Sequence, residues 1–363
     1  MTHSTLLLGV LNFSQFIPIL VLTPWAGGLA DRVDRRKLLL VSQSLAVVLA
    51  GGLAALAWSG LATTWVVIAD TLALGVVSAF SAPAQQALIV SLVGKGDVPT
   101  AVALNSMTFN IARALGPVGA AVSVHYLGIP ASFAINALSY CVFVGALVIV
   151  RPRAQQKASR EESRVRDSLR LLRERPELAA FLAIVAIVGF ASDPVNTLSP
   201  AFAREFGRPD TWAGLIVGTF GAGAVTAALV LAGRVAGSRA RMSATLLLLG
   251  AGVMAFSLSP WLALGFGFLF VGGFGYLASN TAATTRLQLG VGESQRGRIM
   301  ALWSLAFLGL RPFASLLDGA IARTWNVRVA GVVLATPALV AGAAVAVSAL
   351  RRPRGRRRRV AAT

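Results

Sequence analysis

Long uninterrupted apolar runs constrain this chain more than any other feature. A window of about 19 residues finds eleven candidate membrane spans. Their approximate ranges are 6–29, 38–59, 62–83, 101–124, 129–150, 178–201, 212–233, 242–258, 260–285, 299–322 and 329–350. A helix needs about 20 mainly apolar residues to cross the hydrocarbon core of a bilayer. The pattern therefore predicts an all-α membrane protein.

The composition excludes the other classes of protein. Hydrophobic residues make up 56% of the 363 residues and charged residues only 13%, about half the charged share of a soluble chain. Intrinsic disorder requires low hydrophobicity. A membrane β-barrel would show short strands that alternate apolar and polar residues. The apolar runs are too long and unbroken for that pattern.

Most of the net charge of +19 is concentrated in a few loops. One set of alternate loops and the C-terminal tail holds 27 of the Lys and Arg residues, and the opposite set holds four. Because such residues accumulate on the cytoplasmic side, we expect a multi-pass protein of the cell membrane with a cytoplasmic C-terminus and an external N-terminus. The basic clusters then indicate topology rather than nucleic-acid binding, and the run 351–359 is expected to contact anionic lipids.

A weak internal repeat divides the chain. Shifting the second part by 195 residues places Pro117 on Pro312. We expect an N-terminal half at 1–150 with five spans, a cytoplasmic linker at 151–176, a C-terminal half at 177–350 with six spans, and a basic tail at 351–363. The counterpart of span 178–201 would precede residue 1. Either the sequence starts inside a twelve-span protein, which we favour, or the protein truly has eleven spans.

Three sequence motifs resemble one transporter family. The segment GGLADRVDRRK at 27–37 resembles the loop motif of the major facilitator superfamily, with Asp34 where the common form has Gly. The matching residues are Gly27, Asp31, Arg32, Arg35, Arg36 and Lys37. The segments SAPAQQALIVSLV at 81–93 and NIARALGPVGAA at 110–121 resemble the drug and siderophore exporter branch, which includes enterobactin-exporter-like proteins. Gly116 and Pro117 are similar to the family's antiporter motif.

The resemblance covers 6–350 and implies two pseudo-symmetric helical halves that rock about a central cavity. It also implies that the loop motif latches the two halves. A carboxylate at Asp31 would stabilise the N-terminus of a neighbouring helix, for which span 299–322 is the expected partner. The arginines would bridge to carboxylates or lipid phosphates. The Gly116–Pro117 pair would form a kink that seals the cavity, or would serve only helix packing.

Charges at membrane depth are the main functional candidates, because such groups are costly in lipid. The basic ones are Arg113 and Arg311 and the acidic ones Asp70, Asp193 and Asp318. We expect Asp70 or Asp193 to couple transport to protons, and Asp193–Pro194 to interrupt its span as broken helices do at transporter sites. Asp318 lies near the outer end of its span and is expected to be hydrated.

Polar residues of the spans are expected to face a substrate cavity, since polar side chains in lipid turn inward. The candidates are Asn12, Gln15, Asn105, Asn110 and Trp303.

One cysteine and two histidines indicate no metal site, and there is no phosphate-binding glycine loop. No catalytic constellation and no cofactor are predicted.

The sequence thus predicts a monomeric proton-coupled exporter of a drug-like or siderophore-like small molecule, and not an enzyme. An uptake carrier or uniporter of the same fold, and a transport-inactive membrane protein, remain as alternatives.

Overall fold

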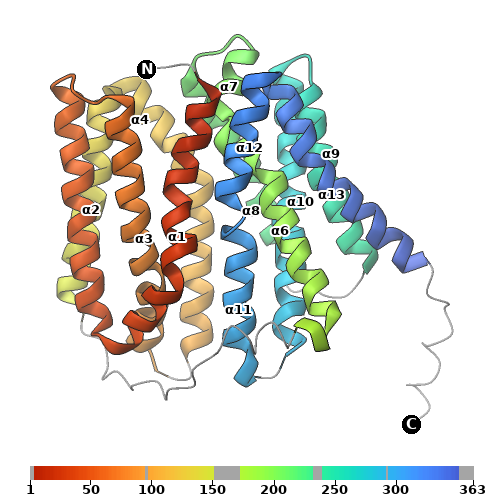
Figure 1. Cartoon of the computed structure of the whole chain (residues 1–363), viewed down its shortest axis with the longest axis horizontal. Helices are drawn as coiled ribbons and strands as arrows, with labels where there is room; N and C mark the ends of the chain where they lie inside the picture. Colours follow the sequence, from red (N-terminus) through yellow and green to blue (C-terminus); the bar gives the residue numbers. More distant parts are fainter. Residues whose placement is uncertain (1–3, 95–96, 151–171, 232–238, 292, 351–363) are drawn as a thin grey trace.

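A computed structural model describes residues 4–94, 97–150, 172–231, 239–291 and 293–350. Helices and short connections make up these ranges, and no strand occurs in them. The first half, at the left of Figure 1, contains four helical elements. They are α1 (Thr5–Arg32), α2 (Arg35–Trp58), α3 (Thr64–Leu92) and α4 (Val98–Ile149).

The second half lies beside the first and contains the remaining elements (Figure 1). They are α6 (Pro176–Thr197), α7 (Ser199–Glu205), the short 3₁₀ helix η2 (Asp210–Trp212), α8 (Ala213–Val230), α9 (Arg239–Leu258), α10 (Leu262–Leu289), α11 (Glu293–Leu308), α12 (Arg311–Thr324) and α13 (Val327–Leu350). The all-α fold expected from the sequence is confirmed. The tail 351–363 and the linker residues 151–171 lie outside the described part.

Among the described residues, ten helices are long and apolar enough to cross a membrane. The sequence predicts eleven, and the difference lies in α4, which contains both spans expected at 101–124 and 129–150. Gly128 interrupts its helical backbone with φ 83° and ψ 171°. A positive φ costs glycine little, because it has no Cβ. The chain reverses there, and Figure 1 shows the two arms of α4 as separate columns.

The two halves differ in how much they bury. In the second half α6 packs against α9, α10, α11, α12 and α13, and these contacts bury a continuous core that includes Val185, Val188, Phe202 and Phe256. The first half has a much smaller described cluster at Leu39, Ala84, Leu88 and Leu147. Many apolar side chains of the first half are exposed, among them Val41, Val48 and Leu138.

The largest contacts between the halves are those of α1 with α12 and of α4 with α8. We call the side of the bundle at which α1 begins and α7 lies the upper side, as in Figure 1. There Gly319 lies so close to α1 that a Cβ on it would sit 2.9 Å from the Thr5 carbonyl oxygen. Gly214 of α8 meets Pro117 of α4 in the same way, with a distance of 2.5 Å to the Pro117 carbonyl oxygen. Small residues thus let the halves pack tightly on the upper side.

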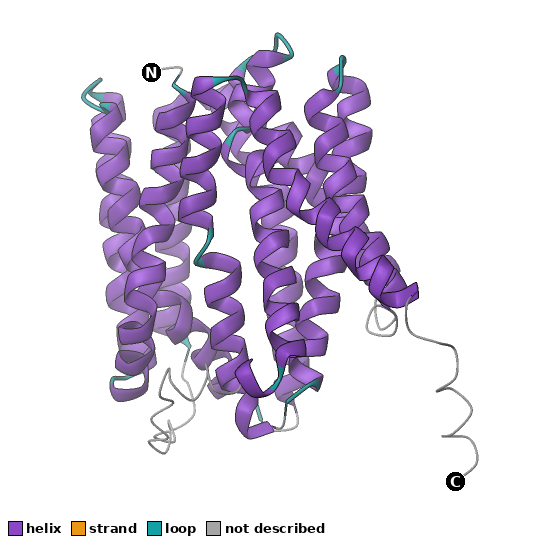
Figure 2. Cartoon of the chain, turned by 45° about the vertical axis from the view of Figure 1, so that its right-hand side comes forward, coloured by secondary structure: helices purple, strands orange, loops and turns teal. Residues whose placement is uncertain are grey.

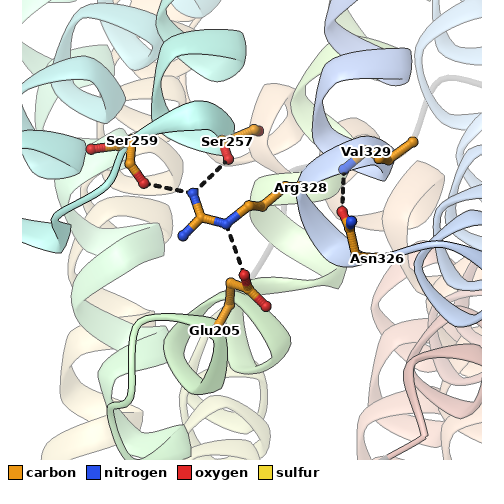
Figure 3. Close-up of polar contacts among 6 residues, drawn as sticks. All are labelled: Glu205, Ser257, Ser259, Asn326, Arg328 and Val329. Carbon is orange, nitrogen blue, oxygen red and sulfur yellow. Dashed lines mark hydrogen bonds and ion pairs between the residues drawn. The ribbon is translucent and has the colours of Figure 1, made fainter.

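One arginine ties together the upper ends of the second half (Figure 3). The guanidinium of Arg328 donates to Glu205 Oε1 at 2.8 Å and to the carbonyl oxygens of Ser257 and Ser259 at 3.2 and 2.6 Å. Arg328 thereby joins α13 to α7 and to the end of α9, where a cation compensates the free carbonyls of a helix C-terminus. This bonding holds the upper ends of these elements together.

Candidate functional site

The site is built around a break in a membrane-crossing helix. The expected span 299–322 consists of α11 and α12, which are separated at Gly309 and Leu310. Figure 2 shows this interruption as a short loop at mid-height of the bundle. Pro312 stands in the first turn of α12, a position that suits proline because no hydrogen bond to its nitrogen is needed there. The break places Arg311 at a helix start within the membrane.

Arg311 connects the two halves. Its guanidinium lies 5.1 Å from the ring centre of Phe16 on α1 and 5.6 Å from that of Phe307 on α11. It also interacts electrostatically with Asp193 on α6. Aromatic faces attract a cation, and a carboxylate neutralises it, so both kinds of contact reduce the cost of burying Arg311.

Asp193 is almost completely buried, with 2% of its surface exposed. Thr197, one turn further along α6, donates a hydrogen bond to its Oδ2 at 2.9 Å. The sequence predicts a helix break at Asp193–Pro194, and this is wrong. Helix α6 continues through Pro194 to Thr197 and ends at Leu198. A proline inside a helix removes the hydrogen bond of its own nitrogen and crowds the preceding turn, but packing in the second half keeps α6 helical through it as far as Thr197.

Asp318 is completely buried, so the expectation that it is hydrated is wrong. It lies in the middle of α12, the upper part of the expected span 299–322, and that helix is covered by α1, α6 and α13. The Asp318 carboxyl group interacts with the Asp193 carboxyl group across the contact between α12 and α6. No described donor reaches either of its oxygens. The structure therefore joins three of the predicted charges, Asp193, Asp318 and Arg311, into one site.

Aromatic rings extend this site along α11 and α10. Phe307 stacks on Trp303 with ring centres 5.1 Å apart, and it approaches Tyr276 at 6.5 Å. The indole nitrogen of Trp303 and the Asn280 side-chain oxygen are buried and have no hydrogen-bond partner in the described structure. An apolar surface with a few unpaired polar groups is typical of small-molecule sites.

The other predicted residues do not join this cluster in the described structure. Asp70 lies on α3, is half-buried, and interacts with Tyr140 of α4. Asn12 donates to the Leu8 carbonyl oxygen of its own helix, Gln15 is exposed, and Asn105 is partly buried. Asn110 and Arg113 lie in α4, but their side chains are outside the described part.

The antiporter-type motif lies at an interface between the halves. The Pro117 carbonyl oxygen faces Gly214 of α8, whereas a Cβ on Gly116 would meet no atom within 4 Å. The helix continues through both residues. These contacts place the motif in the packing of α4 against α8.

The loop motif organises a turn within the first half. Asp34 caps the N-terminus of α2, and its Oδ1 accepts hydrogen bonds from the backbone nitrogens of Arg36 and Lys37 at 2.9 and 3.1 Å. The Arg36 side chain donates to the carbonyl oxygens of Leu147 and Val148 at the end of α4. Its described bonds thus join two helices of one half and do not bridge the halves. Arg35 begins α2. Gly27, Asp31 and Arg32 are in α1, but nothing beyond the backbone is described for them.

Asp34→Ala should lower the free energy of unfolding by about 1 kcal/mol, because alanine cannot accept the two backbone hydrogen bonds that start α2. Thermal unfolding of the purified protein in detergent measures the change. Lys37→Ala is the matched control, since its exposed side chain makes no bond within this cap. Equal stability of the Asp34→Ala variant and the wild type would contradict this role.

The sequence matches one protein family over nearly its whole length. Residues 1–359 match the model of a family described as transmembrane secretion effectors of the major facilitator type. The chain belongs to this family. Members of this family are multi-pass membrane transporters of the major facilitator type and not enzymes.

Three curated proteins share parts of the sequence. The staphyloferrin A transporter of Staphylococcus aureus is 33% identical over 39% of this chain and 36% of its own length. An uncharacterised transporter of Bacillus subtilis, YfiS, is 26% identical over 70% of this chain and 61% of its own length. Macrolide efflux protein A of Streptococcus pyogenes is 23% identical over 56% of this chain and 52% of its own length. The chain thus spans less than two thirds of each relative.

Solved structures share the fold over nearly the whole chain. A mutant of the nucleoside transporter NupG superposes with a TM-score of 0.74 at 12% identity, covering 95% of this chain and 91% of that one. A bacterial homologue of the lysosomal transporter Spinster gives 0.66 at 14% identity, covering 96% and 88%. These superpositions establish the helical architecture of the chain. The sequence identities are too low to indicate its substrate.

Sequence reasoning missed several residues of the site. Thr197 is one helical turn from Asp193, so its hydrogen bond could have been found from the spacing. Phe307 and Tyr276 carry no distinguishing signal, because aromatic residues occur throughout the spans. The glycines Gly9 and Gly319 mark a close helix contact only once their partner helices are known.

Proposed function

We propose that this chain is a proton-coupled exporter of a drug-like or siderophore-like small molecule, with the lower side of the bundle in the cytoplasm. The observation that carries the proposal is the buried Asp193, which faces Arg311 while Arg311 contacts Phe16 of the opposite half. A titratable carboxyl group at the meeting point of two moving halves can link protonation to their movement. The names of the staphyloferrin A and macrolide relatives support the substrate class.

The orientation is supported by the basic residues. Connections rich in Arg and Lys join helix ends on the lower side, such as the turn between α1 and α2 with Arg35 and Arg36. The positive-inside rule places that side in the cytoplasm. The tight glycine contacts on the upper side then correspond to a state that is closed toward the outside.

Transport by everted membrane vesicles tests the export direction. Vesicles that contain the wild-type chain are energised with a proton gradient and given a soluble extract of the source cells, supplemented with a macrolide and staphyloferrin A. Mass spectrometry should find at least one compound accumulated inside, and a protonophore should prevent this. Accumulation only in right-side-out vesicles would indicate uptake, and no accumulation in either kind would overturn transport by this chain.

Gly9→Ala should open the upper side, because its Cβ would overlap the carbonyl oxygen of Ser315 across the contact between α1 and α12. The measurement uses a Cys141→Ser background with Ser315→Cys as a reporter. Ser315 is completely buried, so a membrane-impermeant maleimide should label the reporter slowly in the parent and several-fold faster with Gly9→Ala. Gly51→Ala is the control, since a Cβ there meets no atom within 4 Å. Unchanged labelling would contradict the closed upper contact.

A further inference from the structure

The second carboxyl group of the site changes the charge balance around Arg311. Asp193 and Asp318 are 2% and 0% exposed, and their carboxyl groups interact across the contact between α6 and α12. Thr197 donates to Asp193, and no described donor reaches either oxygen of Asp318. Two neighbouring ionised carboxylates repel each other, and neither has a hydrogen to donate, so such a buried pair favours a state in which one of them carries a proton.

The groups that could neutralise two negative charges are few. On the helices packed around the pair, Arg311 is the one described cation that interacts with Asp193. One guanidinium balances one carboxylate, and an additional buried charge without a partner is strongly unfavourable. The neutral arrangement of the site is therefore one Arg311 cation, one carboxylate and one protonated carboxyl group.

The other charged groups on these helices are engaged or lie elsewhere. Arg328 bonds to Glu205 and to two carbonyl oxygens, Arg286 lies over the ring of Phe181, and Arg323 is exposed. The lower ends of α6 and α9 carry Glu177, Arg239 and Arg241. On the upper side Arg204 pairs with Asp210. The phenol ring of Tyr276 adjoins Phe307. The side chains of Asp31, Arg32, Glu293, Arg296 and Arg298 are outside the described part.

We propose that Asp193 and Asp318 form a two-carboxyl site that holds a single proton, with Arg311 as its fixed counter-ion. This deepens the proposed function, because it names the group that carries the proton. Helix α1 covers α12 next to the pair, where Thr5 and Gly9 contact Gly319. When α1 moves away from α12 on the upper side, water reaches Asp318, and the proton exchanges with that side. While the upper contact is closed, the proton stays in the site.

Infrared spectroscopy of the purified protein in lipid nanodiscs tests the site without a transported substrate. The probe is the proton itself, supplied by buffers around neutral pH. The wild type should show the carbonyl absorption of one protonated carboxylic acid that exchanges slowly with heavy water. Asp193→Asn and Asp318→Asn should each remove the whole band, because the remaining carboxylate then pairs with Arg311. Arg311→Gln should about double the band. Without their counter-ion both carboxyl groups are expected to be protonated, and both then contribute to the absorption.

The matched control is Asp210→Asn, which removes an exposed carboxylate that is paired with Arg204 and should leave the band unchanged. Circular dichroism and gel filtration verify that each variant is folded. If one asparagine variant does not fold, the other and Arg311→Gln still decide the question. Absence of the band in the wild type, or a band in Asp193→Asn that matches the wild type, would overturn the shared proton.

The infrared result and the transport result are independent. A band that behaves as expected in a protein whose vesicles show no proton-driven export would overturn the proposed function and leave the carboxyl site standing. Proton-driven export by a protein without the band would overturn the site alone.

Discussion

Asp193→Asn is expected to abolish proton-driven accumulation in everted vesicles, reducing it to the level of vesicles that lack the protein. Asparagine has nearly the same size and can still accept the hydrogen bond from Thr197, but it cannot bind or release a proton. Exchange of labelled for unlabelled substrate across proteoliposomes should persist, because exchange requires the rocking of the halves and no net proton movement. The contrast between lost accumulation and retained exchange identifies a coupling residue.

Two further variants make this result specific. Asp210→Asn should accumulate substrate like the wild type, since Asp210 is an exposed partner of Arg204 on the upper side. Asp70→Asn tests the second carboxylate that the sequence singles out. Loss of accumulation with Asp70→Asn and full activity with Asp193→Asn would move the coupling function to α3 and contradict the role of the buried site.

Gly273→Ala should destabilise the second half strongly and lower the free energy of unfolding by about 3 kcal/mol, the upper part of the usual range for an overpacked core. A Cβ on Gly273 of α10 would overlap the carbonyl oxygen of Phe220 on α8, and one on Gly223 of α8 would overlap that of Phe270. These are backbone atoms of helices packed in the core, so neither side can yield by a change of rotamer. The two helices would have to separate, which would also disturb the ring contact between Phe220 and Tyr276.

Thermal unfolding in detergent, followed by the loss of monodisperse protein, measures this effect. Gly267→Ala is the matched control on the same helix, because a Cβ there meets no atom within 4 Å. The control should be neutral or slightly stabilising, since alanine favours a helix more than glycine does. Equal melting temperatures for Gly273→Ala and Gly267→Ala would contradict the close packing of α8 against α10.

The architecture could be predicted largely from the sequence because lipid imposes a simple rule. Every backbone polar group in a bilayer needs an internal partner, so each long apolar run had to become a helix, and the observed helices follow the predicted spans closely. The family motif likewise depends on local spacing, and the match over residues 1–359 confirms the resemblance. Local reasoning failed at Pro194, where packing keeps α6 helical up to Thr197.

The site itself was predicted only in pieces. Asp193, Arg311 and Asp318 stood out because charges are rare in membrane spans, but the sequence does not show that they meet. Asp193 and Asp318 are 125 positions apart, and their contact depends on how α6 packs against α12. The burial of Asp318 has the same origin, since its distance from the end of its helix suggested contact with water and the covering by α1, α6 and α13 removed it.

The sequence by itself determined that this protein crosses the membrane many times, which family it belongs to, and which few residues carry charge at membrane depth. These properties depend on composition and on spacing along one helix. The tertiary structure decided which charges share a site, which helices meet across the two halves, and which glycines allow them to touch. Those properties depend on packing between residues far apart in the chain, where one angle of rotation of a helix determines whether a carboxyl group faces lipid, water or another carboxyl group.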